Sequence, residues 1–200
     1  MAGFDHFNLI GPFYDLIFGR RADDTIIRRV AANPTHNILD VGGGTGRVTV
    51  LLKPSARHVV IADSARKMLN QAKEKDIECI QTFSEFLPFV DGAFDRIVLV
   101  DALHHVIDQQ RTLNEMWRLL APGGKMIIEE GDIHNWLVKI IAWGEKLLLM
   151  RSHFLEPEQI VSMCRFDPRA KIELIREKGI AWVIISKNID NIKRRKRGLR

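Results

Sequence analysis

The stretch ILDVGGGTGRVTVLL, residues 38–52, decides how the fold begins. Residues 38–41 are apolar except for Asp40, and they run into a turn of four glycines and one threonine. Glycine adopts positive φ and carries no Cβ, so a ligand can approach the backbone of such a turn. An apolar helical pattern follows, and a helix N-terminus presents free N–H groups. We interpret this corner as a cofactor site, with a purely structural turn as the alternative.

The spacing of the glycines narrows the cofactor class. Gly42, Gly44 and Gly46 give G-x-G-x-G, and Arg47 stands where the dinucleotide fingerprint has its third glycine. This disfavours a nicotinamide-dependent oxidoreductase. Asp63 follows Gly46 by seventeen residues, close to where such folds place an acid on a ribose. The alternative is a helix cap, a role that Ser64 could fill equally well.

Short β-rich runs alternate with helical patterns along the chain, which predicts an α/β fold with a mostly parallel sheet and helices on both faces. Three residues, 177–179, separate the last two runs, so that pair must be an antiparallel hairpin. Asp108 is expected to cap a helix that Ala121–Gly124 stops, and Ser64 to cap another. The predicted strands are Asn37–Val41, His58–Ala62, Glu78–Thr82, Arg96–Val100, Lys125–Glu129, Lys171–Arg176 and Ala181–Lys187.

The charge distribution and the cysteine content limit which partners and which cellular compartment are expected. Residues 188–200 hold six of the 30 lysines and arginines against one aspartate, and the other 187 residues carry 24 cations and 24 anions. The basic tail could bind phosphate-rich partners or be a solvated end, and a neutral body disfavours nucleic acid as a partner. Cys79 and Cys164 lie far apart without a CxxC or histidine cluster, so we expect no metal site. Reduced thiols, no signal peptide and no apolar run of eighteen residues predict a cytoplasmic location.

Four linked motifs carry a resemblance to a known family. They are ILDVGGGTGRVT, VVIADSARKML, SEFLPFVDGAFDRIVLVDALHHV and LAPGGKMIIEE, and FYDLIFG at residues 13–19 adds a fifth. In order and spacing, residues 13–130 resemble the class I S-adenosylmethionine-dependent methyltransferases, in the branch of the ubiquinone/menaquinone-biosynthesis enzymes. The resemblance implies a Rossmann-like, seven-stranded, three-layer sandwich with a C-terminal antiparallel hairpin. It implies S-adenosylmethionine as cofactor and S-adenosylhomocysteine as product.

The same resemblance assigns cofactor roles to individual residues. Asp40 would support the glycine loop from the end of its strand, and Asp63, followed by Ser64, would take the ribose hydroxyls. Phe83 stands where the branch commonly has an acidic or amide residue, so it could stack on the adenine while the Ser84 backbone reads its edge. Asp101 could contact the cofactor or the substrate from its strand end. The methionine part would be lined by Gly42, Gly44, Thr45 and Gly46.

Catalytic residues are harder to read, because methyl transfer mainly requires an oriented nucleophile. A base is needed only where that nucleophile must lose a proton. His104 and His105 follow a strand end and are the candidates for that base, with a packing role as the alternative. Tyr14 could hydrogen-bond the cofactor or the substrate.

The expected organisation is one methyltransferase domain over residues 1–187, followed by a basic tail at 188–200. Residues 1–34 would form an N-terminal helical lid segment, and 131–165 a substrate-pocket insertion. Within the insertion Trp136–Met150 is unusually apolar, which indicates an apolar acceptor, a homodimer face or ordinary core packing. The predicted function is methyl transfer to a small apolar or aromatic acceptor. The alternatives are a cofactor-binding module without catalysis and an RNA or protein methyltransferase.

Overall fold

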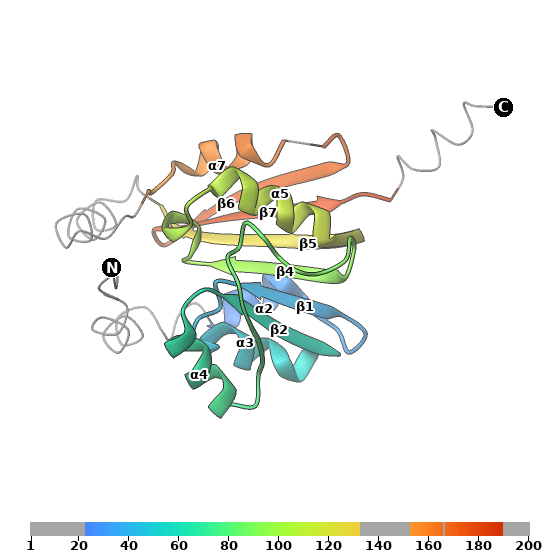
Figure 1. Cartoon of the computed structure of the whole chain (residues 1–200). Helices are drawn as coiled ribbons and strands as arrows, with labels where there is room; N and C mark the ends of the chain where they lie inside the picture. The colour runs from blue at the N-terminus through green and yellow to red at the C-terminus, as the bar shows by residue number, and fades with distance from the viewer. Residues whose placement is uncertain (1–22, 133–152, 166, 190–200) are drawn as a thin grey trace.

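The computed structural model describes residues 23–132, 153–165 and 167–189 (Figure 1). Its centre is a seven-stranded sheet in the order β3-β2-β1-β4-β5-β7-β6. The pairs from β3 to β5 are parallel, whereas β7 runs antiparallel to both β5 and β6. The predicted mostly parallel sheet with its terminal hairpin is therefore confirmed. The strands are β1 (Asn37–Val41), β2 (His58–Asp63), β3 (Glu78–Gln81), β4 (Phe94–Val100), β5 (Leu120–Gly131), β6 (Ala170–Glu177) and β7 (Ile180–Lys187).

The helices begin and end close to where the sequence indicates, with two exceptions. Asp108 caps α5 by accepting from the N–H of Arg111 at 2.9 Å, as predicted. Ala65, and not Ser64, is the N-cap residue of α4, so that expectation was wrong. Residues 121–124 lie within β5, since α5 already ends at Leu119. The described helices are α2 (Asp23–Val30), α3 (Arg47–Leu52), α4 (Arg66–Glu74), α5 (Gln109–Leu119) and α7 (Pro157–Met163), with 3-10 turns at Lys53–Ser55 and Leu103–His105.

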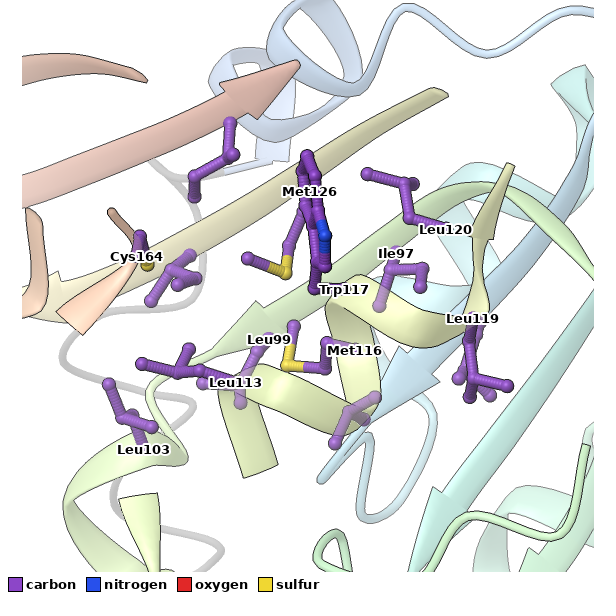
Figure 2. Close-up of a cluster of buried hydrophobic side chains, with 14 of the residues drawn as sticks. Ile97, Leu99, Leu103, Leu113, Met116, Trp117, Leu119, Leu120, Met126 and Cys164 are labelled. Carbon is purple, nitrogen blue, oxygen red and sulfur yellow. The ribbon is translucent and has the colours of Figure 1, made fainter. Parts of the chain in front are cut away.

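The helices cover both faces of the sheet. On one face α2 and α3 pack on the strands through a cluster that includes Ile26, Val48 and Trp182, and α4 lies beside them over β2 and β3. On the other face α5 and α7 contribute to the larger cluster. Figure 2 shows side chains of α5 lying against those of β4 and β5 in this larger cluster. Alternate strand residues thus contribute to two apolar layers, and the carboxyl ends of β1, β2, β4 and β5 lie at one edge because these strands are parallel.

The C-terminal hairpin is joined by a tight turn at Lys178 and Gly179, both at positive φ (54° and 81°). At its far end Lys187 is buried, and its Nζ donates to the carbonyls of Trp117 and Leu120 at 2.8 and 2.7 Å. It also lies 4.7 Å from the Trp117 ring centroid. The last strand is therefore fastened to the C-terminus of α5.

The structure describes only part of the expected lid segment, pocket insertion and basic tail. Within residues 1–34, α2 belongs to the core layer, because Ile26 and Val30 are 1% and 0% exposed. The lid prediction therefore concerns residues 1–22, which lie outside the described residues, as do 133–152 and most of the basic tail. Within the described ranges, no helix has the length and hydropathy needed to cross a membrane.

Candidate functional site

The glycine corner between β1 and α3 has the geometry that its sequence indicates. Gly42, Gly44 and Gly46 all have positive φ. A Cβ on Gly46 would lie 2.5 Å from Cδ1 of Ile77, which is far inside contact distance. A Cβ on Gly43 would lie 2.7 Å from the carboxyl carbon of Asp40. The turn is therefore packed tightly against Asp40 on β1 and against Ile77, just before β3.

Asp40 lies beneath this turn. Its side chain is 1% exposed, and one carboxylate oxygen accepts from the Thr49 hydroxyl at 2.6 Å. Burial raises the pKa of Asp40 to about 7, and the Thr49 hydrogen bond only partly opposes that rise. The supporting position implied by the resemblance agrees with this geometry, and direct contact with a cofactor stays a prediction. Thr45 is half-buried, and its carbonyl accepts from Lys75 Nζ at 2.8 Å.

Asp63, at the end of β2, binds the backbone on both sides of the site. One carboxylate oxygen accepts from the N–H of Gly44 at 2.9 Å, and the other from the N–H of Ala65 at 2.7 Å. Burial raises the pKa of Asp63, and these backbone donors oppose the shift. Each oxygen retains a lone pair for a further donor. Ser64 is exposed, and its carbonyl accepts from the Gln81 side chain at 3.1 Å. Asp63 thus spans the glycine turn and the start of α4.

The segment after β3 presents an aromatic ring. Phe83 is 57% exposed, so its ring is open for stacking. Ser84 turns the other way, because its hydroxyl lies 2.9 Å from that of Thr112 on α5. The Thr82 N–H donates to the carbonyl of Asp63 at 2.9 Å, which holds this segment beside the end of β2. Phe83 and Asp63 are therefore side by side at the same edge of the sheet.

The ends of β4 and β5 form a third part of the site. Asp101 has φ 52°, a left-handed conformation that is uncommon outside glycine and that recurs at functional positions. His104 is 2% exposed, its Nδ1 lies 2.6 Å from Glu130 Oε2, and its ring stacks on Phe154 at 4.2 Å. The other Glu130 oxygen accepts from the N–H of Leu103 at 2.6 Å. Glu130 was missed by the sequence analysis, since only the pairing of β4 with β5 brings it to His104.

The two histidines differ in their surroundings. The ring centroids of His104 and His105 are 3.9 Å apart. Burial, and then the charge of His104, lower the pKa of His105 to about 3, so its ring is neutral at ordinary pH. Ligand atoms of Asp101, His104 and Glu130 all lie within 4.8 Å of one another, close enough to share a metal ion. The absence of a metal therefore stays a prediction. Tyr14 lies outside the described residues.

Comparison with known proteins identifies the family. Residues 39–128 match a protein-family model described as a methyltransferase domain. This match and the relatives below support a class I S-adenosylmethionine-dependent methyltransferase domain. It is 36% identical over 110 residues to the ubiquinone/menaquinone biosynthesis C-methyltransferase UbiE of Vibrio parahaemolyticus, covering 50% of this chain and 42% of that protein. It is 34% identical over 143 residues to the demethylmenaquinone methyltransferase of Thermus thermophilus, covering 62% of this chain and 63% of that protein.

Solved structures agree on the fold. An S-adenosylmethionine-dependent methyltransferase of Thermotoga maritima superposes with a TM-score of 0.74 at 19% identity, covering 92% of this chain and 98% of that one. The chain spans less than half the length of the UbiE relative that it matches. S-adenosylmethionine is the cofactor of the methyltransferase domain. The residues present suit it, because the turn at Gly44 has no Cβ, Asp63 offers acceptors and Phe83 offers an open ring.

Proposed function

We propose that this protein transfers a methyl group from S-adenosylmethionine to a small, apolar or aromatic acceptor. The observation that carries the proposal is the placement of Asp63 between the glycine turn and α4, beside the exposed ring of Phe83. Asp63 would accept from the ribose hydroxyls and Phe83 would stack on the adenine. Such a pairing is specific to a nucleoside and does not require the pyrophosphate of a dinucleotide.

The cofactor, when bound, supplies a methyl group already activated on a sulfonium. The protein's task is then to orient the acceptor and, for a phenol or ring carbon, to take up its proton. Glu130 fixes the ring of His104 through Nδ1, which leaves the proton-accepting role to Nε2. We assign His104 as the proton acceptor and Glu130 as its positioning residue. A pKa of about 3 gives His105 little affinity for a proton at neutral pH.

The proposed acceptor class follows from the relatives. UbiE of Vibrio parahaemolyticus is named for C-methylation in ubiquinone and menaquinone biosynthesis, and the Thermus thermophilus relative for methylating demethylmenaquinone. We extend this to an apolar aromatic ring carbon as the acceptor here. The apolar segment Trp136–Met150, which lies outside the described residues, supports an apolar acceptor by its composition.

Two measurements, made one after the other, test the proposal. Calorimetry of the full chain with S-adenosylhomocysteine should show binding, and NAD should not bind. Mass spectrometry should then detect a gain of one methyl group on an aromatic quinol, with no transfer to RNA or protein. Binding without transfer to any acceptor would favour the cofactor-binding module, and binding of NAD alone would refute the proposal.

Paired histidine variants test the assignment of the base. His104→Gln should reduce kcat strongly, while His105→Gln, the matched control, should retain most of it. Glu130→Gln should lower kcat less than His104→Gln and shift the pH profile of kcat, because it changes how His104 holds its proton. Equal losses for both histidine variants would contradict the assignment.

A further inference from the structure

Glu129 is a buried carboxyl group that neither the fold nor the proposed mechanism uses. Its residue is 7% exposed, and Oε2 has no hydrogen-bond partner among the described residues. It lies two residues after the buried Ile127, and along a strand such residues point to the same face of the sheet. That face is the one covered by α2 and α3. An apolar side chain would extend the core at this position, so the carboxyl group needs another explanation.

A buried carboxylate oxygen without a hydrogen-bond partner is costly. Burial, and then the charge of Asp101, raise the pKa of Glu129 to about 7. Glu130 also raises the pKa, whereas Arg47 and Arg29 lower it. Arg29 binds Glu177 through one terminal nitrogen at 3.2 Å and lies over the Trp182 ring, and its Nε has no hydrogen-bond partner among the described residues. A cationic ligand group would satisfy the unpaired oxygen and stabilise the charged form.

Glu129 lies beside the strained end of β4. The N–H of Asp101 donates to the carbonyl of Glu129 at 2.9 Å. The two acidic residues therefore lie next to each other, one just after β4 and the other on β5. Ala102, next to Asp101, is so close to the glycine turn that a Cβ on Gly42 would lie 2.7 Å from its own Cβ. The Glu129–Asp101 pair therefore lies on the β4–β5 side of the glycine turn.

The order of the strands sets the direction in which the cofactor extends. Asp63 ends β2 and Phe83 follows β3, so the proposed ribose and adenine positions occupy these two strands. Ribose lies between adenine and the amino-acid part of the cofactor. Adenine at β3 therefore sends the amino-acid part the other way, over β1 toward β4 and β5. Three strand spacings separate β2 from β5, roughly 14 Å at about 4.8 Å each, which an extended amino-acid chain with a hydrogen bond at each end can span.

We propose that Glu129, together with Asp101, binds the primary ammonium group of the amino-acid part of S-adenosylmethionine. The assignment rests on the proposed function and adds a residue on β5 to the cofactor site. A carboxylate and an ammonium group make a charge-assisted hydrogen bond, which is stronger in a buried setting than at the surface. The left-handed backbone at Asp101 turns the chain at the end of β4 beside Glu129.

The test compares a ligand that carries the amino-acid part, with its ammonium group, and a ligand that lacks this part. S-adenosylhomocysteine carries the amino-acid part without the sulfonium charge, and 5′-methylthioadenosine keeps the nucleoside but lacks the amino-acid part. By calorimetry, Glu129→Gln should bind S-adenosylhomocysteine roughly 10- to 100-fold more weakly than wild type. Its affinity for 5′-methylthioadenosine should stay within about twofold. The matched control is Glu173→Gln on β6, an exposed residue, which should alter neither affinity.

Stability provides an independent readout. Without ligand, Glu129→Gln should melt at or above the wild-type temperature, because it removes a buried acid with one unpartnered oxygen. Asp101→Asn is the second variant, since asparagine tolerates the left-handed conformation, and it should show the same ligand selectivity more weakly. Unchanged affinity for S-adenosylhomocysteine, or equal losses for both ligands, would overturn the assignment alone. Failure of wild type to bind S-adenosylhomocysteine would overturn the proposed function as well.

Discussion

Replacement of Asp63 by alanine should separate loop support from cofactor binding in one experiment. The side chain accepts two backbone hydrogen bonds, from Gly44 at 2.9 Å and from Ala65 at 2.7 Å. Asp63 is half-buried, so water can reach the two freed N–H groups. We therefore expect the lower end of the usual cost, about 1 kcal/mol for each lost bond. For a chain of this size, about 2 kcal/mol corresponds to a melting temperature lowered by roughly 4–8 °C.

The effect on binding should be larger than the effect on stability. Two charge-assisted bonds to ribose hydroxyls would be lost, costing about 2–4 kcal/mol, or roughly 30- to 1,000-fold in affinity for S-adenosylhomocysteine. Calorimetry measures this directly, with Glu78→Ala as a control at the opposite end of the neighbouring strand β3. A cofactor analogue without ribose hydroxyls should bind wild type and Asp63→Ala about equally. A folded Asp63→Ala protein that binds S-adenosylhomocysteine within threefold of wild type would refute the reasoning.

Substitutions at three further positions test the structural interpretation, and the third is combined with a compensating change at Ile77. Asp40→Asn keeps an acceptor for Thr49 but removes a buried acid whose pKa is raised from 3.8 to about 7. The folded protein holds that proton more tightly, so wild-type stability should fall as pH rises from about 4 to 7. The advantage of the variant in free energy of unfolding should grow over this window by at most about 4 kcal/mol, and a pH-independent difference would contradict it. Lys187→Met removes the donor to two carbonyls and should lower the free energy of unfolding by about 1–3 kcal/mol in urea denaturation. Gly46→Ala should lower the melting temperature because its Cβ would meet Ile77, and Ile77→Val should recover part of that loss.

Much of the fold could be predicted because its signals are local. The buried runs around Ile97 and Ile127 and the short connection at 177–179 already indicate a mixed sheet with a terminal hairpin. Helix capping was harder, since Asp63 lies one residue before Ser64 and its carboxylate accepts the N–H of Ala65, the N-cap residue of α4. Competition between two polar neighbours is decided by backbone geometry that the sequence does not display.

The site was predictable where it follows a single strand end and less so where two strands meet. The glycine turn and Asp63 belong to one continuous pattern. The contact of Glu130 with His104, 26 residues apart, depends on the register in which β4 pairs with β5. Glu129 has alternation as its signal, because an acid on the buried face of an apolar strand is unexpected. That its Oε2 has no partner among the described residues becomes visible only in the three-dimensional structure.

The position of β7 has a consequence for how the protein is made. β7 is inserted between β5 and β6, and it carries the fully buried Trp182. During synthesis β5 therefore leaves the ribosome long before β7, its second partner strand. Until β7 emerges, the edge of the nascent sheet at β5 stays unpaired. Folding of the described sheet can be completed only once residue 187 has emerged. We expect chains stalled before β7 to be favoured substrates for chaperones, whatever their sequence has already formed at the cofactor site.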